Sequence, residues 1–224
     1  MDCSENNENI ENYYKFIELI YQAHLEYCDK WLSIIDSEQR INLNSKQIRD
    51  IINNKCINRK VCSQNFLKYM QSFNKNLDTL QWDIASKIIE KCDSDLEFRH
   101  RIKEDDSTYI KILRKSKHQD GKFPIKKCIN DLLGFRIIEE DMDSMIEQIE
   151  VKINELKEND HRIKFIRRIK SDYKGYHIYF GGSNNYCFPI ELQLWNRRDK
   201  QSNNESHRIR KQKHLKWIKE FTEF

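Results

Sequence analysis

The stretch FPIELQLW, residues 188–195, places a glutamate and a glutamine among bulky apolar residues. Glu191 and Gln193 are two positions apart, so in a strand both side chains point to the same face of the sheet. A carboxylate inside an apolar strand is costly unless it has a partner, although an edge strand would let it face solvent. We expect a strand here, with a polar site on one of its faces.

Strand-like runs recur around this stretch, all of them beyond residue 95. They are short, rich in Ile, Leu, Phe and Tyr, and separated by segments with helical spacing over 106–116 and 142–158. They predict one mixed sheet, and a basic helix over 204–221 closes the chain. The runs predicted as strands are residues 96–102, 132–138, 162–169, 177–180 and 188–195.

The first part of the chain has a different pattern. Apolar residues at helical spacing predict a long helix over 8–36, and the helical spacing continues over 44–94. We therefore expect an α+β fold. It has a helical region over 1–94 that packs on a core over 95–224, which holds the mixed sheet and its flanking helices.

Size and composition agree with a single packed core. The chain has 224 residues. Its hydrophobic share of 38% is low for a globular protein, and its charged share of 34% is high. Eleven Phe, ten Tyr and four Trp still supply enough large side chains to fill an interior. Long disordered regions are therefore not expected.

Cysteine spacing and hydropathy bear on the cellular compartment. The seven cysteines are scattered and form no C-x-x-C pair, so a zinc site or redox dithiol is not indicated and reduced thiols are expected. No apolar run has the length of a membrane span, and the N-terminal MDCSENNENIEN is acidic, unlike a signal peptide. We expect a cytoplasmic protein that does not associate with membranes.

Cations and a hydroxyl are regularly spaced in RIKEDDSTYIKILRK, residues 101–115. Arg101 and Lys103 would share one face of a strand, while Ser107 and Lys111 would share one face of the helix that EDDS begins. Two cations beside a helix start form a suitable cradle for phosphate groups. Ordinary solvated charge is the alternative explanation.

A second polar pair interrupts the apolar run DLLGFRII, residues 131–138. Asp131 precedes the strand and Arg136 lies within it, so the two side chains could simply be ion-pair partners. Alternatively, Asp131 and Glu191, on strands of one sheet, could share a Mg²⁺ ion, which prefers oxygen ligands and keeps substrate phosphates in its shell.

Taken in order, these pieces resemble the synthetase domain of the RelA/SpoT-like alarmone synthetases, which has a nucleotidyltransferase-like fold. The family pattern R-x-K-x-x-x-S-x-x-x-K is matched by residues 101–111, D-[IL]-x-G-[IF]-R-[IV]-[IV] by DLLGFRII, and E-[VIL]-Q-[IL] by ELQL. The resemblance covers roughly residues 95–215. After ELQL the chain departs from the family, with Trp195 and Asn196 where an arginine and a threonine are common.

The resemblance implies transfer of the β,γ-pyrophosphate of ATP to a ribose 3′-hydroxyl. Arg101 and Arg136 would sandwich the adenine of ATP by guanidinium stacking. Lys103, Ser107 and Lys111 would hold its phosphates.

The two carboxylates would have separate tasks under the same resemblance. Asp131 and Glu191 would both bind Mg²⁺, and Glu191 would also accept the proton of the attacking hydroxyl. Catalysis would consist mainly of positioning and charge neutralisation.

The acceptor site is expected around RIKSDYKGYHIYF, residues 168–180. The family has G-Y-x-[SAG]-x-H here, with a tyrosine that stacks on the acceptor base. The favoured alignment gives Tyr173 as the stacking ring, Gly175 as the small residue and His177 as the histidine, with Gln193 nearby. The other alignment would make Tyr176 the stacking residue.

Two molecules are candidates for the acceptor. A toxic small subclass of the family modifies the 3′-terminal CCA adenosine of tRNA, and two basic clusters here would suit an acceptor stem. GDP or GTP is the alternative acceptor. The cations predicted to contact the tRNA backbone are Arg167, Arg168, Lys170, Lys211 and Lys213.

Two other functional classes and a protein partner are alternatives for this sequence. A non-catalytic RNA-binding module on the same fold would not need both Asp131 and Glu191, and a tRNA-like nucleotidyltransferase would not need the 101–111 cradle. The acidic first helix offers a surface for a neutralising antitoxin protein or for a second copy of the chain.

Overall fold

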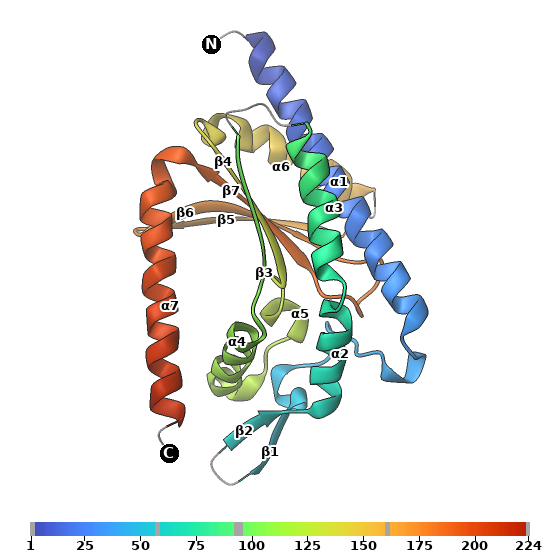
Figure 1. The fold of residues 1–224 in the computed structure, drawn as a ribbon. Coiled ribbons are helices and arrows are strands. Elements are labelled where there is room, and N and C mark those ends of the chain that lie inside the picture. Colours follow the sequence, from blue (N-terminus) through green and yellow to red (C-terminus); the bar gives the residue numbers. More distant parts are fainter. Residues whose placement is uncertain (1–2, 57–58, 92–95, 160–161, 223–224) are drawn as a thin grey trace.

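A five-stranded mixed sheet lies at the centre of the fold (Figure 1). The structure, a computed structural model, describes residues 3–56, 59–91, 96–159 and 162–222, and their side chains outside 3–9, 53–61 and 213–222. The sheet confirms the predicted α+β class. The strands are β3 (Glu97–Ile102), β4 (Leu133–Glu139), β5 (Ile163–Lys170), β6 (Tyr173–Phe180) and β7 (Ile190–Asn196).

The strands follow the order β3-β4-β7-β6-β5. β4 and β7 run parallel, and every other neighbouring pair is antiparallel. β7 is therefore the middle strand, and Glu191 and Gln193 lie in the sheet interior and not at an edge. β6 begins at Tyr173, four positions before the predicted start at residue 177.

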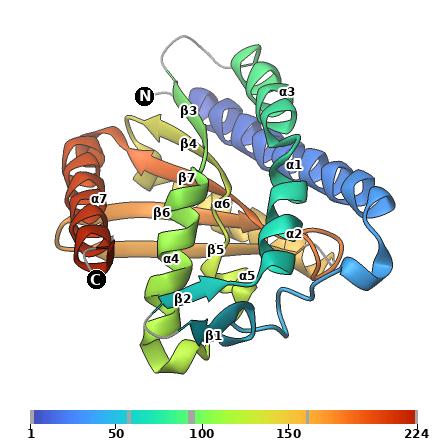
Figure 2. The ribbon, with the colours of Figure 1, turned by 60° about the horizontal axis from the view of Figure 1, so that its bottom comes forward.

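Helices cover the two faces of the sheet unequally. α1 (Cys3–Ile34), α3 (Leu77–Ile89) and α6 (Met142–Glu158) lie on one side, and α7 (Lys200–Thr222) lies on the other, next to β6 (Figures 1 and 2). α4 (Asp105–Lys117) and the short α5 (Ile125–Cys128) lie between β3 and β4 in the chain. The predicted helices over 8–36, 106–116, 142–158 and 204–221 are all confirmed.

The expectation that residues 44–94 are helical is wrong in part. α2 (Gln64–Asn74) and α3 are helical, but a hairpin of β1 (Ile52–Cys56) and β2 (Arg59–Cys62) precedes them. Asn, Val, Ile and Cys dominate this segment, and these residues have weaker helix propensities than Ala, Leu or Lys. β-branched residues instead favour strands, which accounts for the hairpin.

Strand alternation separates an apolar face of the sheet from a polar one. On β7, Leu192 and Leu194 are fully buried in the main hydrophobic core, which includes residues from both the N-terminal helices and the sheet. Glu191, Gln193 and Trp195 alternate with them and point to the opposite face. The polar site is thus built on a strand that is buried on both sides.

The remaining general expectations concern thiols and membranes. Cys28, Cys62, Cys128 and Cys187 are free and buried, as predicted for reduced structural thiols. Cys3, Cys56 and Cys92 lie outside the described side chains. None of the helices in the described part of the chain is long and apolar enough to span a bilayer.

His24, on α1, predicts an acid-sensitive contribution to stability. It is fully buried next to the thiol of Cys28, and burial, assisted by the charge of Lys126, lowers its pKa to about 3. The unfolded chain would take up a proton near pH 6.5, whereas the folded chain would not, so stability falls as the pH drops below 6.5. Urea unfolding should show wild type losing about 1.4 kcal/mol more per pH unit than His24→Leu between pH 6 and 4. Equal slopes would show that folded His24 becomes protonated.

Candidate functional site

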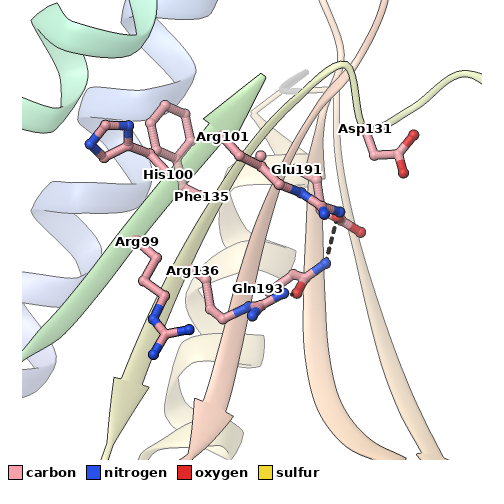
Figure 3. A pocket seen from close by; sticks show the side chains of 9 residues that line it. Arg99, His100, Arg101, Asp131, Phe135, Arg136, Glu191 and Gln193 are labelled. Atoms are coloured by element: carbon pink, nitrogen blue, oxygen red, sulfur yellow. Dashed lines mark hydrogen bonds between the residues drawn. The ribbon is translucent and has the colours of Figure 1, made fainter. Parts of the chain in front are cut away.

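Two rows of side chains cross the polar face of the sheet. The strand register aligns Arg101, Gly134 and Glu191 in one row, and Arg99, Arg136 and Gln193 in the next. Gly134 leaves open space between its neighbours, since a Cβ there would meet no atom. The rows border a cavity of about 210 Å³ (Figure 3). Its lining residues are Arg99, His100, Arg101, Asp131, Gly134, Phe135, Arg136, Glu191 and Gln193.

Asp131 lies at one end of this cavity, held by two lysines. Lys103 Nζ is 2.7 Å and Lys111 Nζ is 3.1 Å from its carboxylate oxygens. Burial opposes ionisation of Asp131, but the charges and hydrogen bonds of Lys111 and Lys103 outweigh it and lower the pKa of the carboxyl. The structure thus joins the predicted cradle to the predicted metal ligand.

The alternative of an ion pair between Asp131 and Arg136 is not what the structure shows. Arg136 Nε instead donates to Gln193 Oε1 at 3.1 Å, and its guanidinium lies 3.6 Å from the Trp195 ring centroid. Burial, followed by the charge of Arg101, lowers the pKa of Arg136 to about 10. Arg101 and Arg136 are therefore close enough to repel each other.

Ser107 lies in the first turn of α4, between the two lysines in the chain. α4 begins at Asp105 with Glu104 as its N-cap residue, and Asp105 and Asp106 form an acidic first turn, as the sequence predicts. Ser107 is half-buried.

Glu191 is buried and both of its oxygens accept hydrogen bonds. His177 Nδ1 lies 2.8 Å from Oε1, and Gln193 Nε2 donates to Oε2 at 2.7 Å. Burial alone would raise the pKa of Glu191, but its hydrogen bond with His177 opposes burial, and the pKa lies below its ordinary value. Burial lowers the pKa of His177 against the opposing effect of Glu191. The pair is thus an ionised carboxylate beside a neutral imidazole.

Tyr173 and Tyr176 lie on opposite faces of β6. Tyr173 points to the Glu191 face, where its hydroxyl lies 2.8 Å from His177 Nε2. Tyr176 points to α6 and donates to Asp143 Oδ1 at 2.5 Å. Only the alignment that uses Tyr173 therefore places a tyrosine beside the cavity residues.

Sequence reasoning missed Trp195. It was regarded only as a departure from the family, yet its indole contacts Arg136 and its Nε1 donates to the Tyr173 hydroxyl at 3.1 Å. The signal was available, since positions 191, 193 and 195 continue one alternating series.

The predicted tRNA-binding cations are not on one surface. Arg167 pairs with Glu150 of α6 at 2.6 Å, on the face away from the cavity. Arg168 points to the cavity face and donates to the hydroxyl of Tyr179. Lys170 and Lys211 are exposed, and the side chain of Lys213 lies outside the described residues.

The turn between β5 and β6 connects two of these basic segments. Asp172 in this turn accepts a hydrogen bond from Ser206 of α7 at 2.9 Å and feels the charges of Arg210 and Lys170. Lys170 at the end of β5 and Arg210 of α7 therefore both lie near the turn at Asp172.

The donor set is suitable for Mg²⁺ but not for a fully protein-enclosed metal. No group of three or more His, Cys, Asp or Glu side chains within the described segments could hold an ion. Mg²⁺ commonly takes only one or two carboxylates and completes its shell with water and substrate phosphates. Asp131 and Glu191 supply that number at the border of one cavity.

Comparison with known proteins gives distant similarities to alarmone synthetases. No family model and no curated protein matches the chain. Small alarmone synthetase 1 from Bacillus subtilis bound to its product pppGpp is 16% identical, over 68% of this chain and 84% of that chain, with a TM-score of 0.42. A second structure of small alarmone synthetase 1 from Bacillus subtilis is 18% identical, over 70% of this chain and 90% of that chain, with a TM-score of 0.30.

A third solved structure is the complex of the type VI effector Tas1 with its immunity protein. It is 17% identical to this chain, over 58% of each chain, with a TM-score of 0.31. All three similarities are distant, so the proposed function rests on the geometry of the site.

Proposed function

We propose that this protein transfers the β,γ-pyrophosphate of ATP to a ribose 3′-hydroxyl, and that the acceptor is the 3′-terminal adenosine of tRNA. The observation that carries the reaction class is the convergence of arginines and two carboxylates on one cavity, with two lysines bound to one of these carboxylates. Cations suit a triphosphate, and an ionised buried carboxylate suits a base.

Each group has a task in the proposed reaction. Arg101 and Arg136 hold the adenine of ATP, and Trp195 supports one side of the Arg136 guanidinium. Lys103, Lys111 and Ser107 bind the phosphates, so the lysines exchange the Asp131 carboxylate for phosphate oxygens.

The bond changes balance without any further reactant. Glu191 accepts the proton of the ribose 3′-hydroxyl, whose oxygen bonds to the β-phosphorus of ATP. The bond between the β-phosphorus and the oxygen bridging it to the α-phosphate breaks, and AMP leaves with that oxygen. A Mg²⁺ ion bound through Asp131 and Glu191 would neutralise charge on the transferred phosphates.

The basic surface beside the cavity supports tRNA over a free nucleotide. Lys170 of β5 and Lys211 of α7 are exposed, and Arg210 lies with Lys170 near the turn at Asp172. A free nucleotide has no use for cations outside the cavity lining, whereas an acceptor stem presents a row of phosphates.

A tRNA that carries pyrophosphate on its terminal 3′-hydroxyl cannot be aminoacylated there. The proposed product would therefore stop translation, and the protein would act as a toxin. Cells that make such a toxin need a neutralising partner, and the exposed carboxylates of Glu11 and Glu26 on α1 offer contacts for a protein antitoxin.

An acceptor competition tests the proposal. Wild-type protein is given Mg²⁺ and ATP labelled at the γ-phosphate, with deacylated tRNA, GDP and GTP together. We expect label in tRNA, with AMP as the co-product, and no label in tRNA whose terminal 3′-hydroxyl is blocked. ADP as the co-product would exclude pyrophosphate transfer, and label in GDP or GTP alone would identify an alarmone synthetase.

Charge reversal tests the choice of acceptor independently of the reaction class. Lys170→Glu combined with Lys211→Glu should strongly reduce tRNA labelling and make it less dependent on salt concentration, because fewer phosphate contacts release fewer counterions. The matched control reverses Lys15 and Lys30, two exposed lysines of α1, with the same change in net charge. Equal losses in both double variants would indicate a nonspecific charge effect.

A further inference from the structure

We propose that Tyr173 is a positioning residue for Glu191, which it holds through His177 by means of its hydroxyl group and not by a stacked ring. This inference rests on the proposed role of Glu191 as the base. It replaces the expectation that the Tyr173 ring stacks on the acceptor base.

A donor at one end and a carboxylate at the other set the direction of the hydrogen bonds that lead to Glu191. The indole N–H of Trp195 can only donate, and it donates to the Tyr173 oxygen at 3.1 Å. The ionised carboxylate of Glu191 can only accept, so His177 Nδ1 carries a proton, and the neutral form of the ring then accepts the Tyr173 hydrogen at Nε2, 2.8 Å from the hydroxyl oxygen. A neutral imidazole that accepts at Nε2 carries its proton on Nδ1.

The neutral ring therefore donates from His177 Nδ1 to Glu191 Oε1 at 2.8 Å. This geometry selects one tautomer of His177 and one orientation of the carboxylate. Because His177 and Glu191 are both buried, water does not offer either group an easy alternative partner.

The second oxygen of the carboxylate is fixed in the same way from the other side. Arg136 can only donate, and its Nε donates to Gln193 Oε1, so the Gln193 amide nitrogen faces Glu191 Oε2 at 2.7 Å. The Arg136 guanidinium lies over Trp195, where the first series of bonds begins. Both oxygens of Glu191 are thus oriented by one closed network, and the Tyr179 hydroxyl adds a further hydrogen bond to the carboxylate.

The Tyr173 ring is enclosed, which argues against a stacking role. Only 3% of the residue is exposed. His207 packs edge-on at 5.6 Å between centroids, Trp195 packs edge-on at 5.9 Å, and the Arg210 guanidinium lies 5.2 Å from the ring centroid. An acceptor base needs an open ring face, whereas the hydroxyl role requires only the enclosure seen here.

Gly175 shows how closely this network is packed. A Cβ at this position would lie 2.9 Å from the Trp195 indole and 2.9 Å from the Tyr173 hydroxyl oxygen. Glycine is therefore required here by the close approach of the two side chains that begin the network.

Tyr173→Phe tests the hydroxyl without removing the ring. We expect kcat to fall about 10-fold or more, which is part of the rate enhancement that a general base supplies. The KM values of ATP and of the acceptor should not change. Tyr176→Phe is the matched control, since Tyr176 is equally buried and also loses one hydroxyl hydrogen bond, but on the α6 face. It should lower thermal stability without lowering kcat.

Two outcomes of this comparison would overturn the proposal. Unchanged kcat and KM in Tyr173→Phe would mean that the ring alone is needed, as in stacking. A fall in stability of both variants with kcat retained in both would mean that the hydroxyl is purely structural.

A nitrogen-15 NMR measurement of the histidine side chains decides the network without any turnover. In wild type, His177, assigned by its loss in His177→Gln, should be neutral with its proton on Nδ1, and Tyr173→Phe should shift its Nε2 resonance. A proton on Nε2 of His177 in the wild type would contradict the inference. Wild-type protein that makes no AMP with any acceptor would instead sink the proposed function, and the NMR result would still decide the hydrogen-bond network.

Discussion

Glu191→Gln is expected to lower the rate of pyrophosphate transfer by about 10²–10⁴-fold, the range for removal of a general base. The substituted amide has nearly the same shape as the carboxylate, so it should still fit in the sheet interior. Its nitrogen cannot accept the proton of a hydroxyl, and it meets the donor nitrogen of Gln193. AMP production from ATP at saturating acceptor measures the loss.

The same variant should remain folded with a moderate loss of stability. One of its donors would face the donor nitrogen of Gln193 or of His177, which leaves a buried polar group unsatisfied at a cost of about 1–3 kcal/mol. Glu150→Gln is the control, because Glu150 lies on α6 and pairs with Arg167 on the face of the sheet away from the cavity. Near-normal turnover in Glu191→Gln would assign the base to another group.

Local periodicity accounts for the parts of the site that could be predicted from the sequence. The spacing of Glu191 and Gln193 placed both on one face of β7, and the spacing of Ser107 and Lys111 placed both on one face of α4. These predictions depend only on residues a few positions apart, whose relation is fixed once a strand or helix forms.

Partnerships across the sheet could not be predicted in this way. The sequence suggested Arg136 as an ion-pair partner of Asp131. In the structure Asp131 instead pairs with Lys103 and Lys111, which are 28 and 20 positions away in the chain. Which cation reaches a carboxylate depends on strand order and on where α4 lies. Neither property is encoded in local spacing.

One prediction failed although the local rule was sufficient to avoid the error. Arg167 and Arg168 were grouped as one basic cluster, but consecutive residues of a strand point to opposite faces. Arg167 accordingly pairs with Glu150 of α6, and Arg168 reaches Tyr179 on the cavity face. Clusters of charge in a strand need to be divided by face before they are assigned to one ligand.

Asp131→Asn is expected to abolish Mg²⁺-dependent turnover, with a loss of about 10²–10³-fold or more from the missing metal ligand. It should also destabilise the folded protein by about 3 kcal/mol, the lower end of the range for a buried charge left without its partner. Lys103 and Lys111, which are 16% and 27% exposed, would then face each other with no counterion between them. Burial already lowers the pKa of Lys103, and loss of Asp131 would lower it further.

A second aspartate separates the loss of stability from the loss of activity. Asp143 of α6 also bonds two cations, Lys174 at 2.5 Å and Arg198, and it is 20% exposed compared with 17% for Asp131. It lies on the opposite face of the sheet, where no substrate group is proposed. Asp143→Asn should therefore lower the urea midpoint as Asp131→Asn does, yet keep wild-type kcat and the wild-type dependence on Mg²⁺. If both variants lose activity in proportion to their loss of stability, the carboxylate of Asp131 is a structural partner of the lysines and the metal must be held elsewhere.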